Sequence, residues 1–227
     1  MIVHDCEQGS PKWHELRCGI PTASQFHRLL TPKKTQMSAQ SWGYFCECLA
    51  EELTGTVEDE ESSQYMERGH KLELQALNWF AFDRSLIVRQ VGFITDDERT
   101  MGCSPDGLIY SDGEPIAGLE IKVPKRATHV GYIERPETLV DKYRLQVQGG
   151  LAVTGFRLWY LLSYNPLIDV LPPVVVEVER DEECIARMKA AIAGFTEAMN
   201  EVLVRRGFRE PPQLESSALE LPAKATA

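Results

Sequence analysis

The sequence predicts an α/β domain in which a central mixed β-sheet is flanked by helices. Three observations support this fold class. Apolar residues recur at helical spacing through most of residues 12–82. From residue 86 onward the pattern changes to short runs of β-branched and aromatic residues that are separated by turns. A helical segment, two further strand-like runs and a last helix then follow, an order typical of a mixed sheet covered by helices.

The first part of the chain is predicted to form four helices. Thr22 and Ser24 carry side chains that can cap the second of them, and Gly55 is the expected end of the third. A polar break around Pro32 and an acidic loop over residues 58–63 separate the last three helices. The expected helices cover residues 12–17, 22–30, 38–54 and 65–82.

The second part of the chain is predicted to supply the sheet. A Ser-Asp-Gly sequence at residues 111–113 is a hairpin-type turn, and the strand before it is bent at Pro105. Residues 136–153 are expected to form a helix, and Asp181 is expected to cap a last helix that ends near Arg205. The predicted strands cover residues 86–95, 101–110, 116–123, 157–164 and 174–178.

The length of 227 residues suits one compact domain, which we expect over residues 1–210. Residues 211–227 are rich in Pro, Ser and Ala and are expected to form a mobile tail.

Charged residues interrupt the apolar stretches well before the length that a membrane span needs. The first ten residues lack the apolar segment of a signal peptide. We therefore expect a cytosolic protein.

Cysteine usage and net charge narrow the function classes. The six cysteines are scattered with no C-x-x-C pair, so reduced structural thiols are expected instead of a zinc or iron–sulfur site. The net charge of −10 argues against non-specific binding of duplex DNA by the outer surface. It leaves room for DNA binding in a protected channel that a few Arg and Lys side chains line.

The most informative residues lie on the two strands that the turn joins. Glu120 and Lys122 are two residues apart, so on a strand their side chains share a face, while Ile121 points to the core. The turn can bring Asp106 beside Glu120. Two adjacent carboxylates repel each other, and a hard divalent cation such as Mg²⁺ relieves that repulsion. The main-chain carbonyl of Ile121 is a further candidate ligand.

A metal at this position could activate water and hold a scissile phosphate. Lys122 could orient the attacking water or offset the charge that grows on the phosphate. The Asp-x(13)-Glu-x-Lys spacing is weak evidence by itself, because strands often alternate Glu and Lys on their exposed face. These three residues alone leave both interpretations open, a nuclease site and an exposed strand face.

Five blocks of residues, in the same order over most of the chain, resemble the viral-recombinase branch of the PD-(D/E)xK nucleases, to which phage lambda exonuclease belongs. They are W-H-x-L-R-x-G-x-x-T-A-S from Trp13, G-x-x-x-E from Gly69, C-S-P-D-G-L from Cys103, L-E-x-K-x-P from Leu119 and Y-x-x-Q-x-Q from Tyr143. Each block is modest, but five in register are specific. The resemblance implies a restriction-endonuclease-like core.

The resemblance also implies roles for individual residues. Asp106 and Glu120 would hold the metal together with the carbonyl of Ile121. Glu73 would bind the metal directly or through water; without the family it would be read as an exposed helix residue. Gln146 would contact metal-bound water or phosphate and act with the catalytic residues.

A second constellation consists of Arg17, Ser24 and Ser104, whose equivalents in the family form a pocket for the DNA 5′-phosphate, with Gln146 beside it. The chemistry is sound, because a guanidinium offers a planar fork to phosphate oxygens and hydroxyls complete the shell. Ser24, near a helix start, adds backbone N–H groups. Without the family, Arg17 would be an ordinary surface arginine and Ser24 a cap. Gln148 is expected to be structural.

The function implied by the resemblance is a Mg²⁺-dependent 5′-to-3′ exonuclease acting on double-stranded DNA with 5′-phosphorylated ends. It would use one or two Mg²⁺ ions, with Mn²⁺ as a substitute, release mononucleotides and leave a 3′ overhang for phage-type recombination. The family further implies a homotrimeric ring, a phage single-strand annealing protein as partner, and a phage or prophage gene product acting in the bacterial cytoplasm.

Two alternatives stay open from the sequence. One is another nuclease of the superfamily, either a restriction-type endonuclease or a helicase- or CRISPR-associated nuclease. The missing cysteine cluster argues against its iron–sulfur members. The other is a catalytically silent subunit that binds DNA ends. The presence of Asp106, Glu120 and Lys122 argues against that reading.

Overall fold

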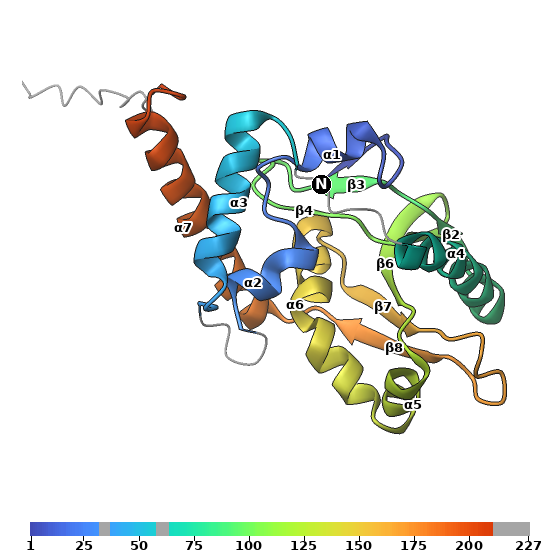
Figure 1. Cartoon of the computed structure of the whole chain (residues 1–227). Helices are drawn as coiled ribbons and strands as arrows, with labels where there is room; N and C mark the ends of the chain where they lie inside the picture. Colours follow the sequence, from blue (N-terminus) through green and yellow to red (C-terminus); the bar gives the residue numbers. More distant parts are fainter. Residues whose placement is uncertain (32–36, 58–63, 211–227) are drawn as a thin grey trace, which may run out of the picture.

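The computed structural model of the chain describes residues 1–31, 37–57 and 64–210, with the side chains of residues 64–71 left aside. The predicted acidic loop at residues 58–63 and the tail at residues 211–227 lie outside the described residues. A five-stranded mixed sheet forms the centre and helices cover both of its faces, which confirms the predicted fold class (Figure 1). Within the described part of the chain, we find no helix with the length and apolar character that a membrane crossing requires.

The central sheet has the strand order β2-β5-β6-β7-β8. Its middle strand, β6, pairs antiparallel with β5 and parallel with β7, and the two outer pairings are antiparallel. Asp112 and Gly113 form the two-residue loop between β5 and β6, and both have positive φ angles, as a type I′ hairpin turn requires. The strands are β2 (Ile87–Arg89), β5 (Gly107–Ser111), β6 (Glu114–Lys122), β7 (Leu158–Ser163) and β8 (Val174–Glu179).

Two apolar cores lie on opposite faces of this sheet. Helix α4 (Gln64–Arg84) packs on one face, where Phe80 and Ile121 are buried together. Helix α6 (Pro136–Thr154) covers the other face and is almost wholly buried from Leu145 onward. Burial of Ile121 confirms that its side chain points to the core, so Glu120 and Lys122 face the α6 side.

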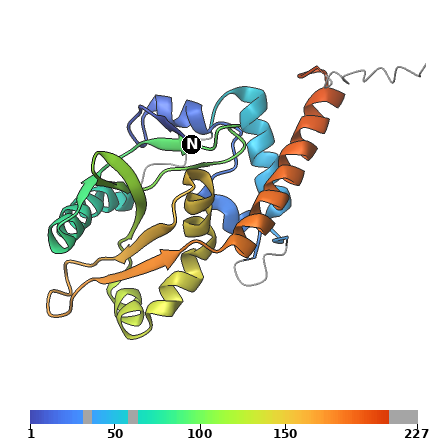
Figure 2. The same ribbon diagram turned by 180° about the vertical axis from the view of Figure 1, so that it is seen from behind.

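Shorter and peripheral helices complete the domain. Helices α3 (Ser41–Thr54) and α7 (Glu182–Arg205) lie side by side at one end, which the front and back views both show (Figures 1 and 2). The remaining helices are α1 (Pro11–Arg17), η1 (Ala23–Gln25), α2 (Phe26–Leu29) and α5 (Arg126–Glu134). The predicted single helix over residues 22–30 is wrong in detail, because it consists of the 3₁₀ turn η1 followed by the one-turn helix α2.

Two of the predicted strands are each divided between different sheets. Residues 86–95 contain β2 and β3 (Phe93–Thr95), and residues 101–110 contain β4 (Gly102–Cys103) and β5. Strands β3 and β4 join β1 (Ile2–His4), which was not predicted, in a second sheet of order β1-β3-β4. The second division falls at Pro105, which has no N–H to donate to a ladder and so favours a break.

Asp181 caps helix α7 as predicted. Its carboxylate accepts a hydrogen bond from the Cys184 N–H at 3.0 Å and forms an ion pair with Arg144 of α6. The N–H of Asp181 donates to Oε1 of Gln148 at 2.9 Å, and the amide of Gln148 donates to the carbonyl of Glu179 at 2.8 Å. This network joins α6, β8 and α7, and it gives Gln148 the structural role that was expected.

Asp181→Ala should therefore destabilise the fold by about 1 kcal/mol near neutral pH, the usual cost of a lost N-cap. The hydrogen bond from Cys184 and the charge of Arg144 lower the pKa of Asp181. The ionised form then stabilises the fold above the pKa of the unfolded residue, and this contribution is lost as the pH falls through the folded pKa. Urea unfolding at several pH values tests this, with the exposed Glu183→Ala as control. An equal difference from wild type at neutral pH and at about pH 3 would contradict it.

Candidate active site

Asp106, Glu120 and Lys122 lie together where β5 begins and β6 ends. The Nζ atom of Lys122 lies 2.6 Å from Oε1 of Glu120. The Asp106 N–H donates to the carbonyl of Leu119 at 3.0 Å, and its Oδ2 accepts a hydrogen bond from the Ile121 N–H at 2.5 Å. Asp106 thus contacts the main chain on both sides of Glu120, and the juxtaposition predicted from strand geometry is present.

The carboxylates of Asp106 and Glu120 lie close together in a buried place, and this proximity changes how they ionise. The Glu120 carboxylate is buried, and the pKa of Asp106 is raised well above its ordinary value by loss of hydration and then by the charge of Glu120. The charge of Lys122 acts to lower the pKa of Asp106. Burial by itself would lower the pKa of the Lys122 ammonium, but the two carboxylates together outweigh it and raise that pKa. One ammonium faces two carboxylates, so the ionised cluster has an excess of negative charge.

The donor set fits a hard divalent cation. Two carboxylates supply oxygen ligands, and the Ile121 carbonyl points to the same side of β6 as the Ile121 N–H, toward Asp106. Within the described residues, no group of three His, Cys, Asp or Glu side chains is placed to hold a metal. Glu73 therefore does not complete a three-acid cluster. Its charge still contributes to the raised pKa of Asp106, so it lies within electrostatic reach.

Gln146 joins the cluster from helix α6. Its amide Nε2 donates to Oε1 of Glu120 at 2.7 Å, the same oxygen that Lys122 contacts. Two donors thus hold one oxygen of Glu120 in place. Within the described part of the chain we find no donor to the other oxygen.

The predicted phosphate-binding residues form a second network beside the first. Oγ of Ser104 accepts hydrogen bonds from Arg17 at 3.3 Å and from the indole of Trp13 at 2.9 Å. Arg17 also lies 3.5 Å from the hydroxyl of Thr22, which in turn lies 3.4 Å from the hydroxyl of Ser24. Thr22 was predicted only as a helix cap, and the structure gives it no capping hydrogen bond. Its place inside the T-A-S part of the first block was the signal for this second role.

Arg17 is not an ordinary surface arginine. Its guanidinium lies 4.0 Å from the centre of the Trp13 ring, and burial lowers its pKa. Among the residues that the structure describes, no carboxylate lies within ion-pair distance of it. Glu51 acts on Arg17 through its charge but forms no ion pair with it. A desolvated guanidinium with hydroxyl partners and no ion pair favours an anionic ligand.

A small cavity of about 30 Å³ joins the two networks. Ser24 and Ser104 line it from the arginine side, and Glu120 and Gln146 line it from the acid side. Two residues of each constellation therefore border one space, whereas Asp106, Lys122 and Arg17 are not among the residues that line it.

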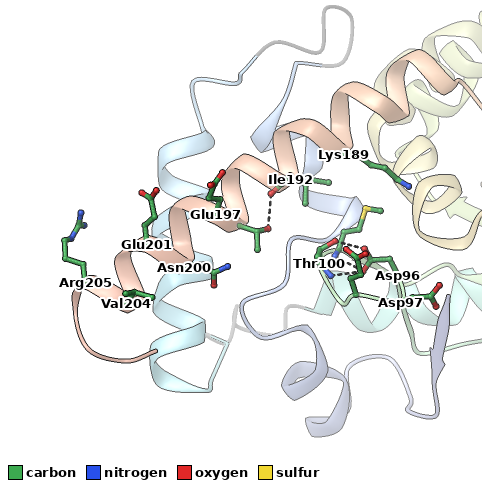
Figure 3. Close-up of a pocket in the computed structure, with 14 residues that line it drawn as sticks. Asp96, Asp97, Thr100, Lys189, Ile192, Glu197, Asn200, Glu201, Val204 and Arg205 are labelled. Carbon is green, nitrogen blue, oxygen red and sulfur yellow. Dashed lines mark hydrogen bonds between the residues drawn. The ribbon is translucent and has the colours of Figure 1, made fainter. Parts of the chain in front are cut away.

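A much larger groove of about 980 Å³ lies elsewhere, between α7 and the turn that joins β3 to β4 (Figure 3). Asp97, Glu197 and Glu201 are among the side chains that line it, and none of the predicted site residues does. The chemistry of the residues, and not the size of the hollow, identifies the candidate site.

A mixed sheet with two acids and a lysine at the end of its central hairpin defines a nuclease of the PD-(D/E)xK type. Residues 12–157 match the YqaJ-like viral recombinase domain, and the chain belongs to that family. A curated protein of Escherichia coli (strain K12) named ExoD is 32% identical over 72 residues, which are 32% of this chain and 83% of that protein.

Solved structures agree with this assignment. The alkaline exonuclease LHK-Exo from Laribacter hongkongensis is 30% identical with a TM-score of 0.70, over 87% of this chain and 98% of that chain. The same enzyme in complex with dAMP is 29% identical with a TM-score of 0.73 and the same coverage. A phage related exonuclease from Haemophilus somnus 129PT, at 15% identity and TM-score 0.66 over 82% of this chain and 96% of that chain, shares the fold. The close structural relatives are exonucleases, and this chain is an enzyme of the nuclease class.

Because Asp106 is held in a crowded acidic cluster, Asp106→Asn should stabilise the metal-free protein. A carboxyl whose folded pKa is raised costs stability once the pH exceeds its unfolded pKa. The variant should therefore be more stable than the wild type at about pH 8, where the buried carboxylate is unfavourable. The gain should vanish near pH 4. Denaturant unfolding in the presence of a chelator measures it, with the exposed Glu98→Gln as control; a less stable variant at about pH 8 would show that the acids are not in conflict.

Proposed function

We propose that this protein is a Mg²⁺-dependent 5′-to-3′ exonuclease that degrades one strand of double-stranded DNA, releases mononucleotides and leaves a 3′ overhang. The observation that carries this proposal is the cavity shared by Ser24 and Ser104 with Glu120 and Gln146. A 5′-phosphate held by the serine side would place the next phosphodiester bond beside the acids. Membership of a viral recombinase family supports the same reading.

Asp106, Glu120 and the carbonyl of Ile121 are the proposed metal ligands, with Glu73 acting through water. Bound Mg²⁺ would supply Lewis acidity to the scissile phosphate and lower the pKa of water. The excess negative charge of the cluster is the feature that fits one or two such ions, with Mn²⁺ as a substitute.

Lys122 is the proposed catalytic amine. Its ammonium contacts Glu120 and lies 4.6 Å from the centre of the Tyr143 ring, so two partners hold its position. From there it can donate a hydrogen bond to the attacking water or to the phosphate oxygen on which charge grows. Gln146 holds one oxygen of Glu120, which leaves the other oriented for the metal.

Arg17, Ser24 and Ser104 form the proposed pocket for the terminal 5′-phosphate, with Gln146 at its border. Hydrolysis of the bond between phosphorus and O3′ of the first nucleotide frees a 5′-mononucleotide. The same step gives the shortened strand a new 5′-phosphate, which can enter the pocket in turn. The pocket thereby sets the direction of digestion.

We propose the oligomeric state of the protein from its family membership. A homotrimeric ring would let basic groups face a central channel and would reconcile DNA binding with a net charge of −10. A viral recombinase domain also fits a phage or prophage gene product that works in the host cytoplasm beside a single-strand annealing protein.

Linear duplex DNA with 5′-phosphates should be degraded in the presence of Mg²⁺, whereas closed circular DNA should persist. If the 5′ ends carry a label, the label should be released first, in the form of a mononucleotide. Asp106→Ala should abolish the activity. Binding of DNA ends by this variant, as by the wild type, is the control for its folding. Cutting of closed circles would point to an endonuclease, and equal activity of wild type and variant would remove the proposed site.

Arg17→Ala should slow the start of digestion on 5′-phosphorylated ends by about 10- to 100-fold, the effect of losing hydrogen bonds to a charged group. The rate on 5′-hydroxyl ends should hardly change, because those ends lack the ligand of Arg17. Single-turnover assays on the two substrates measure this. Arg28→Ala is the matched control, since Arg28 forms an exposed ion pair with Glu47. Equal slowing on both substrates would argue against the phosphate pocket.

A further inference from the structure

The indole of Trp159 carries a buried hydrogen-bond donor that has no partner. Trp159 is 1% exposed, and its Nε1 atom has no acceptor in the part of the chain that the structure describes. A buried N–H left without an acceptor costs stability, so such groups call for an explanation where they occur. An indole N–H can only donate, so a cation cannot satisfy it.

Two glycines place the Trp159 ring under the candidate site. A Cβ atom added to Gly118 or to Gly150 would lie 2.5 Å from the ring, so the ring fills the space of both missing side chains. Gly118 is two residues before Glu120 on β6, and residues two apart share a face of a strand. Gly150 is one helical turn after Gln146 on α6. The ring therefore lies beside both Glu120 and Gln146.

Trp159 also lines the small cavity that the two constellations share. Ser24 and Ser104 border the same space, and the guanidinium of Arg17 donates a hydrogen bond to Oγ of Ser104. Among the described residues that line the cavity, Glu120 is the one acid, and one of its oxygens already accepts from Lys122 and Gln146. The cavity has room for about one water-sized group, which matches a single phosphate oxygen.

We propose that the indole N–H of Trp159 donates a hydrogen bond to an oxygen of the 5′-phosphate of the bound nucleotide. Trp159 is then a further specificity-determining residue, the donor at the floor of the phosphate pocket. This inference rests on the proposed function, because it takes the pocket to bind a 5′-phosphate. It adds a residue that the sequence motifs do not contain.

The direct test is the NMR signal of the Trp159 indole N–H in ¹⁵N-tryptophan-labelled, metal-free protein. Trp159→Phe assigns the signal, and if that variant does not fold, Phe at each of the other three tryptophans assigns it by elimination. Saturating dAMP should move the Trp159 signal downfield, and deoxyadenosine, which lacks the phosphate, should leave it in place. The signal of Trp79, which packs in the other core, should not move. A Trp159 signal whose chemical shift does not change on addition of dAMP would overturn the inference. It would indicate that a resident water accepts the hydrogen bond of the indole N–H.

The functional test compares 5′-phosphate with 5′-hydroxyl DNA ends. Trp159→Phe should reduce the advantage of the 5′-phosphate in KM about tenfold, the effect of one hydrogen bond to a charged group. Trp79→Phe is the matched control for loss of packing and should keep the full advantage. A Trp159→Phe enzyme with the wild-type advantage overturns the role of Trp159 alone. A wild type without any preference for 5′-phosphate instead removes the proposed pocket itself.

Discussion

The structure of the site depends on the hydrogen bond between the Asp106 carboxylate and the Ile121 N–H. This bond continues the pairing of β5 with β6 past the last ladder residues and holds an acid from one strand against an acid from the next. The fold keeps that unfavourable pair in place with two apolar cores, one on each side of the sheet. The stability of the domain thus offsets the crowding of like charges that a cation would relieve.

Much of the fold and of the site could be predicted from the sequence. Alternation along β6 set the directions of Glu120, Ile121 and Lys122, because the side-chain period of a strand is fixed. The hairpin turn and the cap at Asp181 have local chemistry that short segments reveal. The joining of Arg17 to Ser104 could be predicted only through the family resemblance, because contacts between distant segments leave no local pattern.

The features that could not be predicted from the sequence were missed for physical reasons. The continuous apolar runs on either side of residues 92 and 105 look like single strands, yet the chain crosses between two sheets there. At Gly92 the main chain of Cys6 comes so close that a Cβ would lie 2.0 Å from its carbonyl oxygen. The linking role of Thr22 depends on tertiary contacts. The position of Trp159 depends on two glycines that lie far apart in sequence, so no local pattern marks it.

The break at Pro105 has a consequence for how far the enzyme can advance at each step. Ser104 and Asp106 flank this proline, one in the network around Arg17 and the other in the acid cluster. A proline restricts its own backbone and that of the residue before it, so the spacing between the two networks is nearly constant. If they bind the end and the cut point of the strand, the length of the excised unit is determined by covalent geometry and not by loop motion. A nuclease with this geometry would release one nucleotide at each cut, and no separate structural element would be needed to set that length.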